Sequence, residues 1–204
     1  MLPAGDAELV QIVDAALADA ARRAGERLAC HPGCAQCCHG AFAINALDAA
    51  RLRAAMEALH AADPAAAAAI EQRARAWIAE HAAEFPGDNR TGAIGTSEAE
   101  QERFEEFAND APCPALDPLT GYCGVYAGRP MTCRVFGPPV RMGEGSGLGH
   151  CELCFQGAPT AEVAACEMQV PHALEEELLA EMANSSETVV AYALLKPVPN
   201  QYEG

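Results

Sequence analysis

The chain has 204 residues and a formal net charge of −16; 50% of its residues are hydrophobic but only 5% are aromatic. Much of the apolar content is alanine, which has high helix propensity and buries little surface, so we expect a mostly helical protein with a thin core. Nucleic acids and anionic membranes are bound through Lys and Arg, so we expect neither as a partner, whereas the acidity favours metal ions.

No segment resembles a targeting or membrane-spanning stretch. Residues 1–13 lack a basic region followed by a continuous apolar one, and no run of about 18 apolar residues occurs. We therefore expect a soluble cytoplasmic protein with its ten cysteines in a reducing compartment. Clustered cysteines there indicate metal or redox chemistry more than disulfides, which stay open if the protein is exported. The length favours a single domain over residues 1–204.

Capping and periodicity signals predict four helices in the first half of the chain. The expected N-caps are Asp6, Asn45, Asp63 (followed by Pro64) and Ser97, the last in a capping box with Glu100. The expected helices cover residues 6–28, 47–60, 63–84 and 97–109.

The character of the sequence changes over residues 112–149, where Pro and Gly are dense and periodicity is lost. Short strands are expected at 122–126 and 132–136. A loop of this length without its own packed structure is unusual unless it is functional, and pinning it to metal is the simplest way to order it. Helices follow at 160–169, 172–184 and 186–195. The expected fold is mainly α, a single helical domain with an irregular cysteine-rich metal-binding segment and at most short strands.

The cysteines fall into three groups along the chain, and all of them are candidate metal ligands. The groups are Cys30, Cys34, Cys37 and Cys38; Cys113, Cys123 and Cys133; and Cys151, Cys154 and Cys166. Thiolates at two- and three-residue gaps can converge on one centre, as zinc and iron–sulfur sites require. Cys166, on an expected helix, could equally be a small buried hydrophobic residue.

The vicinal pair Cys37-Cys38 suggests more than one metal. Adjacent side chains point in well-separated directions, so both cannot easily serve one tetrahedral metal alongside Cys34. We therefore hypothesise two metal centres, or one polynuclear centre, in which these neighbours reach different metals.

Nearby imidazole and guanidinium groups are candidates for supporting roles. His39 and His150 flank cysteines and could lie at the metal. Arg129 and Arg134, with Arg141, bring positive charge into the cysteine-rich loop and would offset the negative charge of thiolates; simple solvation of the loop explains them equally well. No phosphate-binding glycine loop or Gly-x-Ser-x-Gly elbow occurs, so no catalytic residue is assigned.

The spacing Cys30-x3-Cys34-x2-Cys37 also matches the motif by which radical S-adenosylmethionine enzymes hold a [4Fe–4S] cluster. Those enzymes usually present it on a β/α barrel. This chain has neither the alternating strands nor the length of such a barrel, so the fold argues against this interpretation.

Three strings in the cysteine-rich span are informative together: Cys30-x3-Cys34-x2-Cys37-Cys38, Cys113-Pro-Ala-Leu-Asp117, and Tyr126-x2-Arg129-Pro130-x2-Cys133-Arg134-x-Phe136. The last is long and specific. Together they resemble the zinc- or iron-chelating cysteine-cluster family of YkgJ-like bacterial proteins, and the same cluster occurs in flagellin lysine N-methylase. The resemblance covers residues 30–155.

The resemblance implies a metalloprotein that binds iron, as an iron–sulfur cluster or as bare iron, or zinc. Seven cysteines map cleanly, at 30, 34, 37, 38, 113, 123 and 133, and Cys151, Cys154 and Cys166 compete for one more position. Iron is slightly favoured, because a lone structural zinc needs only four thiolates. The alternatives are a metal-dependent protein-modifying enzyme resembling the methylase, and a protein that stores or relays zinc or copper(I).

Overall fold

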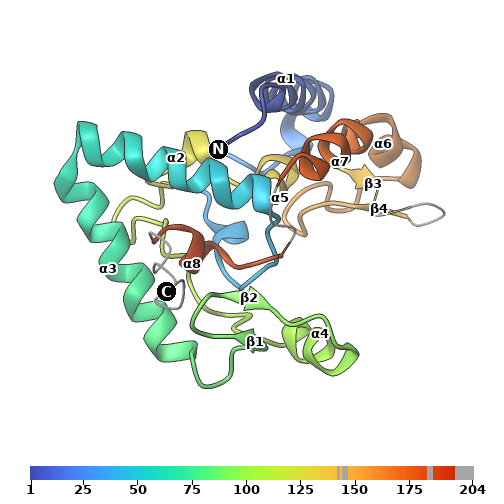
Figure 1. The fold of residues 1–204 in the computed structure, drawn as a ribbon. Helices are drawn as coiled ribbons and strands as arrows, with labels where there is room; N and C mark the ends of the chain where they lie inside the picture. The colour runs from blue at the N-terminus through green and yellow to red at the C-terminus, as the bar shows by residue number, and fades with distance from the viewer. Residues whose placement is uncertain (142, 144–146, 183–185, 196–204) are drawn as a thin grey trace.

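The computed structural model describes residues 1–141, 143, 147–182 and 186–195, and its fold is mainly α, as expected (Figure 1). None of the described helices is long and apolar enough to cross a membrane. The helices are α1 (Asp6–Ala24), α2 (Ala46–Ala62), α3 (Pro64–His81), α4 (Glu98–Glu105), α5 (Met131–Val135), α6 (Thr160–Ala165), α7 (His172–Ala180) and α8 (Val190–Ala193). Two small antiparallel sheets pair β1 (Gly87–Asp88) with β2 (Ala93–Ile94) and β3 (Val140–Arg141) with β4 (Leu148–Gly149).

The capping signals locate three of the four expected helix starts. The Asn45 side chain accepts from the N–H of residue 48, Asp63 does the same at the start of α3, and Ser97 forms the predicted capping box with Glu100. The prediction for Asp6 is wrong: Gly5 is the N-cap, and the Asp6 carboxylate instead accepts hydrogen bonds from Arg51 of α2. A buried ion pair formed across the fold outweighs the local cap.

The two strands predicted in the cysteine-rich segment are also wrong. Part of this region forms a 3-10 turn over Tyr126–Gly128, and the next part forms α5, which follows Pro130. The N–H of Met131 donates to the buried Asp48 carboxylate at 2.8 Å, so a distant side chain fixes the start of this helix. Local propensity for a strand loses to that tertiary contact.

The last three helices are shorter than expected. α6 stops at Ala165, and α7 stops at Ala180, before the expected end at 184, which lies outside the described residues. α8 begins only at Val190, because Thr188 pairs with Ile44 as an isolated β-bridge and keeps the preceding backbone extended.

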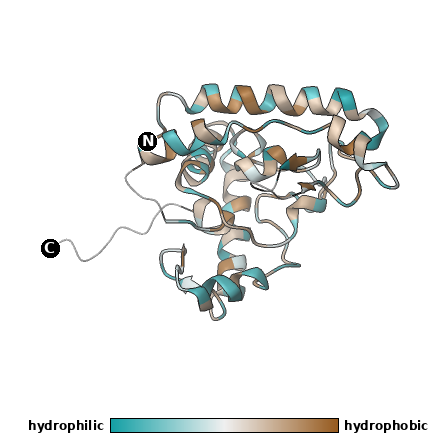
Figure 2. Cartoon of the chain, turned by 90° about the vertical axis from the view of Figure 1, so that its right-hand side faces the viewer, coloured by the Kyte–Doolittle hydropathy of each residue, from teal (hydrophilic) through white to brown (hydrophobic). Residues whose placement is uncertain are grey.

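Among the residues that the structure describes, the apolar core is divided into four small clusters, and Figure 2 shows hydrophobic residues as short, interrupted patches along the chain. The first cluster lies between α2, α3 and α8, with partly buried Cys113 and Cys123 packed against it. The second joins α1, α5 and α7, and the third surrounds Trp77. The fourth consists of Ala24, Cys151, Cys154, Phe155 and Cys166. Cysteines therefore adjoin two different clusters.

Candidate metal centres

Backbone pairing brings the first two groups of cysteines together. The N–H of Cys113 donates to the carbonyl of Cys38 at 2.7 Å, and His39 pairs with Pro112 as an isolated bridge. Gly40 lies in the left-handed region (φ +90°), where a Cβ would stand 2.9 Å from the Asn109 carbonyl oxygen, so glycine allows this close approach. The chain then turns back through a second bridge that ends at Cys123.

Nine of the ten thiols form two sets of neighbours, recognised by which nearby thiols contribute to the shifted pKa values of cysteines in the set. The five-cysteine set comprises Cys37, Cys38, Cys113, Cys123 and Cys133. The pKa of Cys113 is raised to about 11 and that of Cys133 is raised more, in both cases mainly by burial and then by neighbouring thiols of the set. The four-cysteine set comprises Cys30, Cys34, Cys151 and Cys154.

The four-cysteine set joins the first motif to the last. The Sγ atoms of Cys30 and Cys154 are 4.0 Å apart. The pKa of the Cys30 thiol is raised to about 12, mainly by burial and then by the neighbouring thiols of Cys154, Cys151 and Cys34. The pKa of Cys151 is raised by burial and by the neighbouring thiols of Cys154 and Cys34.

The donor chemistry of both sets fits a thiophilic metal. All ten cysteines are free thiols. The 4.0 Å separation is far longer than a disulfide bond and close to the sulfur–sulfur edge of about 3.8 Å in a tetrahedron with metal–sulfur bonds of about 2.3 Å. Within the part of the chain that the structure describes, no three His, Cys, Asp or Glu side chains already stand in metal-holding geometry. The thiols of each set therefore lie near one another, and their side chains would have to rotate toward a common point to bind a metal.

The division between the two sets does not fall where the vicinal pair suggested. Cys37 and Cys38 hydrogen-bond to each other and lie in the same set, whereas Cys34 lies in the other. The hydrogen bond with the Cys38 thiol lowers the pKa of Cys37 to about 6, and it raises the pKa of Cys38. Cys37 and Cys38 belong to the 3-10 turn over Gln36–Cys38, and Cys34 precedes that turn.

Arg129 brings a positive charge close to two cysteines of the five-cysteine set. Its guanidinium lowers the pKa of both Cys37 and Cys123, although burial remains the larger influence on Cys123 and raises its pKa overall. The guanidinium carbon lies 3.9 Å from the centre of the Tyr126 ring, and a nitrogen donates to Asp14 of α1 at 3.3 Å.

Arg134 forms hydrogen bonds that hold its own segment against α1. Its side chain is 2% exposed, and it donates to both oxygens of Asp14 at 2.9 Å and to the Ala127 carbonyl. Its Nε is buried without a hydrogen-bond partner among the described residues. Asp14 therefore ties the segment that carries Cys133 to α1.

A buried charge network that the sequence did not reveal supports the same segment. Arg51 donates to Asp6 at 2.6 and 2.9 Å and to Asp48 at 2.6 Å, and Asp48 accepts the Met131 N–H. Burial raises the pKa of Asp48 to about 6 despite the Arg51 charge. Asp48 also raises the pKa of Cys133, so this network reaches the five-cysteine set. Asp48 and Arg51 lie three residues apart on α2, whereas Asp6 is on α1 and Met131 on α5, so no local motif marks the network as a whole.

The remaining residues that the sequence suggested for the metal site are two histidines, Arg141 and Cys166, and they belong to neither set. The His39 and His150 imidazoles are next to the carbonyls of Ala35 and Cys151. Arg141 pairs with Glu167. Cys166 is 5% exposed in the fourth apolar cluster, so its surroundings are those of a buried hydrophobic residue.

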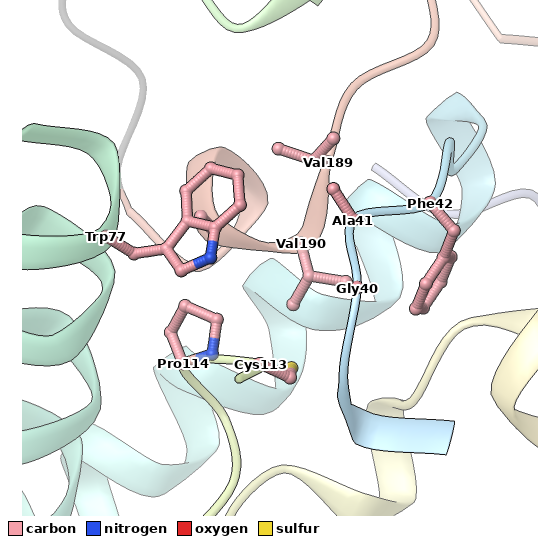
Figure 3. Close-up of a pocket in the computed structure, with 9 residues that line it drawn as sticks. Gly40, Ala41, Phe42, Trp77, Cys113, Pro114, Val189 and Val190 are labelled. Atoms are coloured by element: carbon pink, nitrogen blue, oxygen red, sulfur yellow. The ribbon is translucent and has the colours of Figure 1, made fainter. Parts of the chain in front are cut away.

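A cavity of about 550 Å³ borders members of both sets of cysteines. The whole five-cysteine set lines it, as do Cys30 and Cys34, and Tyr122, Tyr126 and Arg129 complete the wall. Figure 3 shows a much smaller pocket of about 20 Å³ that also touches Cys113, where Trp77, Pro114 and Val190 face one another. That volume suits a single water molecule. The cavity of about 550 Å³ and another of about 650 Å³ both border Cys113, so a ligand can approach this cysteine from either of them.

One comparison with known proteins decides the family. Residues 29–144 match the CxxCxxCC family, described as "Putative zinc- or iron-chelating domain". The chain belongs to this family. In this chain the first gap of the cysteine pattern holds three residues, His31 to Gly33. No curated protein and no solved structure gives a match. The match ends before Cys151, so the last three cysteines lie outside it.

Proposed function

We propose that the chain is an iron-binding metalloprotein whose principal centre is held by the five-cysteine set. The observation that carries this proposal is that all five cysteines of the set, from residues 37–38, 113, 123 and 133, line the same 550 Å³ cavity. A single tetrahedral zinc needs four thiolates and little space. A surplus thiol and a cavity of this size favour iron, bound directly by thiolates or as an iron–sulfur cluster.

The charge around the set supports the same proposal. A centre held by four or five thiolates keeps net negative charge, and Arg129 is placed to offset part of it. Because Arg129 also packs on Tyr126, its guanidinium is held in place rather than free in solvent.

Iron and acid-labile sulfide, measured on protein purified without oxygen, test the proposal. Iron with matching sulfide supports a cluster, and iron without sulfide supports direct thiolate ligation. Cys123→Ser should lose the iron, whereas Cys166→Ser, a matched change at a buried cysteine outside the set, should keep it. Zinc alone in the wild-type protein, or iron retained by Cys123→Ser, would contradict the proposal.

A metal-dependent enzyme that modifies a protein or small molecule is the second candidate. The apolar cavity beside the five-cysteine set favours it, because its volume lies in the range of small-molecule sites. An open coordination position at the iron is the decisive property. Cyanide or nitric oxide should change the iron spectrum if such a position exists, and an unchanged spectrum would indicate a closed centre.

A zinc or copper(I) relay is less favoured by the burial of the thiols. Burial strongly raises the pKa of Cys113 and Cys133, whereas a relay needs thiolates that exchange metal readily. Transfer of bound metal to a competing chelator within seconds would favour the relay, and retention over hours would favour a resident centre.

A further inference from the structure

We propose that Cys30, Cys34, Cys151 and Cys154 form a second, separate metal centre: a closed four-thiolate zinc site that clamps the chain beyond the family domain onto the end of α1. This goes beyond the proposed function, since it concerns other cysteines and another metal. Two of its ligands, Cys151 and Cys154, lie outside the family match.

The geometry has the features of a structural zinc site. The ligands come as two short-gap pairs, Cys30-x3-Cys34 and Cys151-x2-Cys154, the arrangement by which zinc sites take two ligands from each of two turns. The Sγ atoms of Cys30 and Cys154 are already 4.0 Å apart, near the tetrahedral edge of about 3.8 Å. Hydrogen bonds shape both turns: Cys34 N–H donates to the His31 carbonyl, and Cys154 N–H to the Cys151 carbonyl, both at 2.9 Å.

The two turns are held face to face by contacts that involve no sulfur. The N–H of Phe155 donates to the Arg27 carbonyl at 2.8 Å, and the Arg27 side chain forms two hydrogen bonds with Glu162. On the other side, Gln36 donates to Glu152 at 2.9 Å. These contacts lie on both sides of the four thiols, so the closeness of the two turns does not depend on one flexible side chain.

Two buried cysteines, Cys151 and Cys154, distinguish this set from the five-cysteine set, whose members are all half-buried. Cys151 and Cys154 are buried in the fourth apolar cluster with Phe155, and neither lines the large cavity. The N–H of Cys151 donates to the Gly137 carbonyl, and a Cβ on Gly137 would stand 2.8 Å from the Cys30 sulfur. Cys30 and Cys34 border the 550 Å³ cavity, but a metal held by all four thiolates would have no coordination position left for a substrate, which is the character of structural rather than catalytic zinc.

The separation from the five-cysteine set makes the site testable on its own. Zinc and iron are measured together in the wild type, in Cys154→Ser and in Cys166→Ser, with circular dichroism to establish folding. We expect Cys154→Ser to lose about one zinc ion per chain and keep its iron. We expect Cys166→Ser, a change at a buried neighbour in the same apolar cluster, to keep both metals.

Equal zinc content in Cys154→Ser and Cys166→Ser would overturn the proposal. Loss of iron together with zinc from folded Cys154→Ser would also overturn it, because it would indicate one polynuclear centre. Loss of zinc from a protein whose wild type has no iron would uphold this site and overturn only the proposed iron centre. If Cys154→Ser fails to fold, cadmium-113 NMR of the cadmium-loaded wild-type protein decides whether there are two metal centres or one. Two thiolate-type resonances support two centres, and a single resonance contradicts them.

Discussion

Replacing Arg51 with methionine should destabilise the protein strongly, because Arg51 is the buried cation that neutralises two carboxylates. Its side chain is 3% exposed, and those of Asp6 and Asp48 are 9% and 3% exposed. Methionine fills the space of the arginine stem but leaves both carboxylates without a charged partner. Removing one member of a buried ion pair costs about 3–5 kcal/mol, which for a chain of this size lowers Tm by about 6–20 °C.

The assay is urea unfolding of Arg51→Met beside Arg53→Met, an exposed arginine on the same helix whose replacement should change stability by less than about 0.5 kcal/mol. The loss should also weaken the Met131–Asp48 hydrogen bond and reduce the iron content, because α5 carries Cys133. A cost for Arg51→Met below about 1 kcal/mol would refute the account of this network.

The pH dependence gives a second check on the same variant. Burial already raises the pKa of Asp48 from 3.8 to about 6 in the folded protein, and loss of Arg51 raises it further. A carboxyl whose folded pKa is raised favours the folded state at low pH, and that contribution is lost as pH rises through the folded pKa. The deficit of Arg51→Met should therefore be larger at about pH 8 than at about pH 5. An equal deficit at both pH values would contradict an electrostatic origin.

Three further predictions follow from single contacts. Asp14→Ala removes the carboxylate shared by Arg129 and Arg134; since Asp14 is 44% exposed, we expect a loss of about 1 kcal/mol in urea unfolding, and no loss would contradict its anchoring role. Gly137 has φ +127°, and a Cβ there would stand 2.8 Å from the Cys30 sulfur, so Gly137→Ala should lower the zinc content. Gly157 also has positive φ but open space around it, so Gly157→Ala should reduce stability without loss of zinc. Equal zinc content in the two variants would contradict the close packing at Gly137. Ser97→Ala should cost about 0.5–2 kcal/mol and leave both metals bound, and metal loss would show that α4 supports the centres.

The sequence predicted the helices wherever a local signal sets the boundary. Asn45, Asp63 and Ser97 mark their helix starts through hydrogen bonds to residues three positions ahead, which composition and spacing reveal. It failed where a distant partner sets the boundary, as at α5, whose first N–H donates to Asp48, and at Thr188, which pairs with Ile44.

The same distinction holds for the candidate site. The cysteines, and Arg129 beside them, stand out in the sequence because clustered thiols and a cation in an acidic chain are local signals. Their division into two sets could not be predicted, since it depends on Cys151 and Cys154 folding back to Cys30 and Cys34 across more than 100 residues. Asp14 and Arg51 are ordinary helix residues in the sequence, and only packing makes them supports of the site.

X-ray absorption spectroscopy of the purified protein, at the iron and zinc edges, tests most directly whether the cysteines hold the metal. The account predicts a first shell made of sulfur alone around each metal, with about four sulfurs at about 2.3 Å from zinc. A shell of nitrogen or oxygen around both metals, or a metal-free protein with paired cysteines, would contradict it.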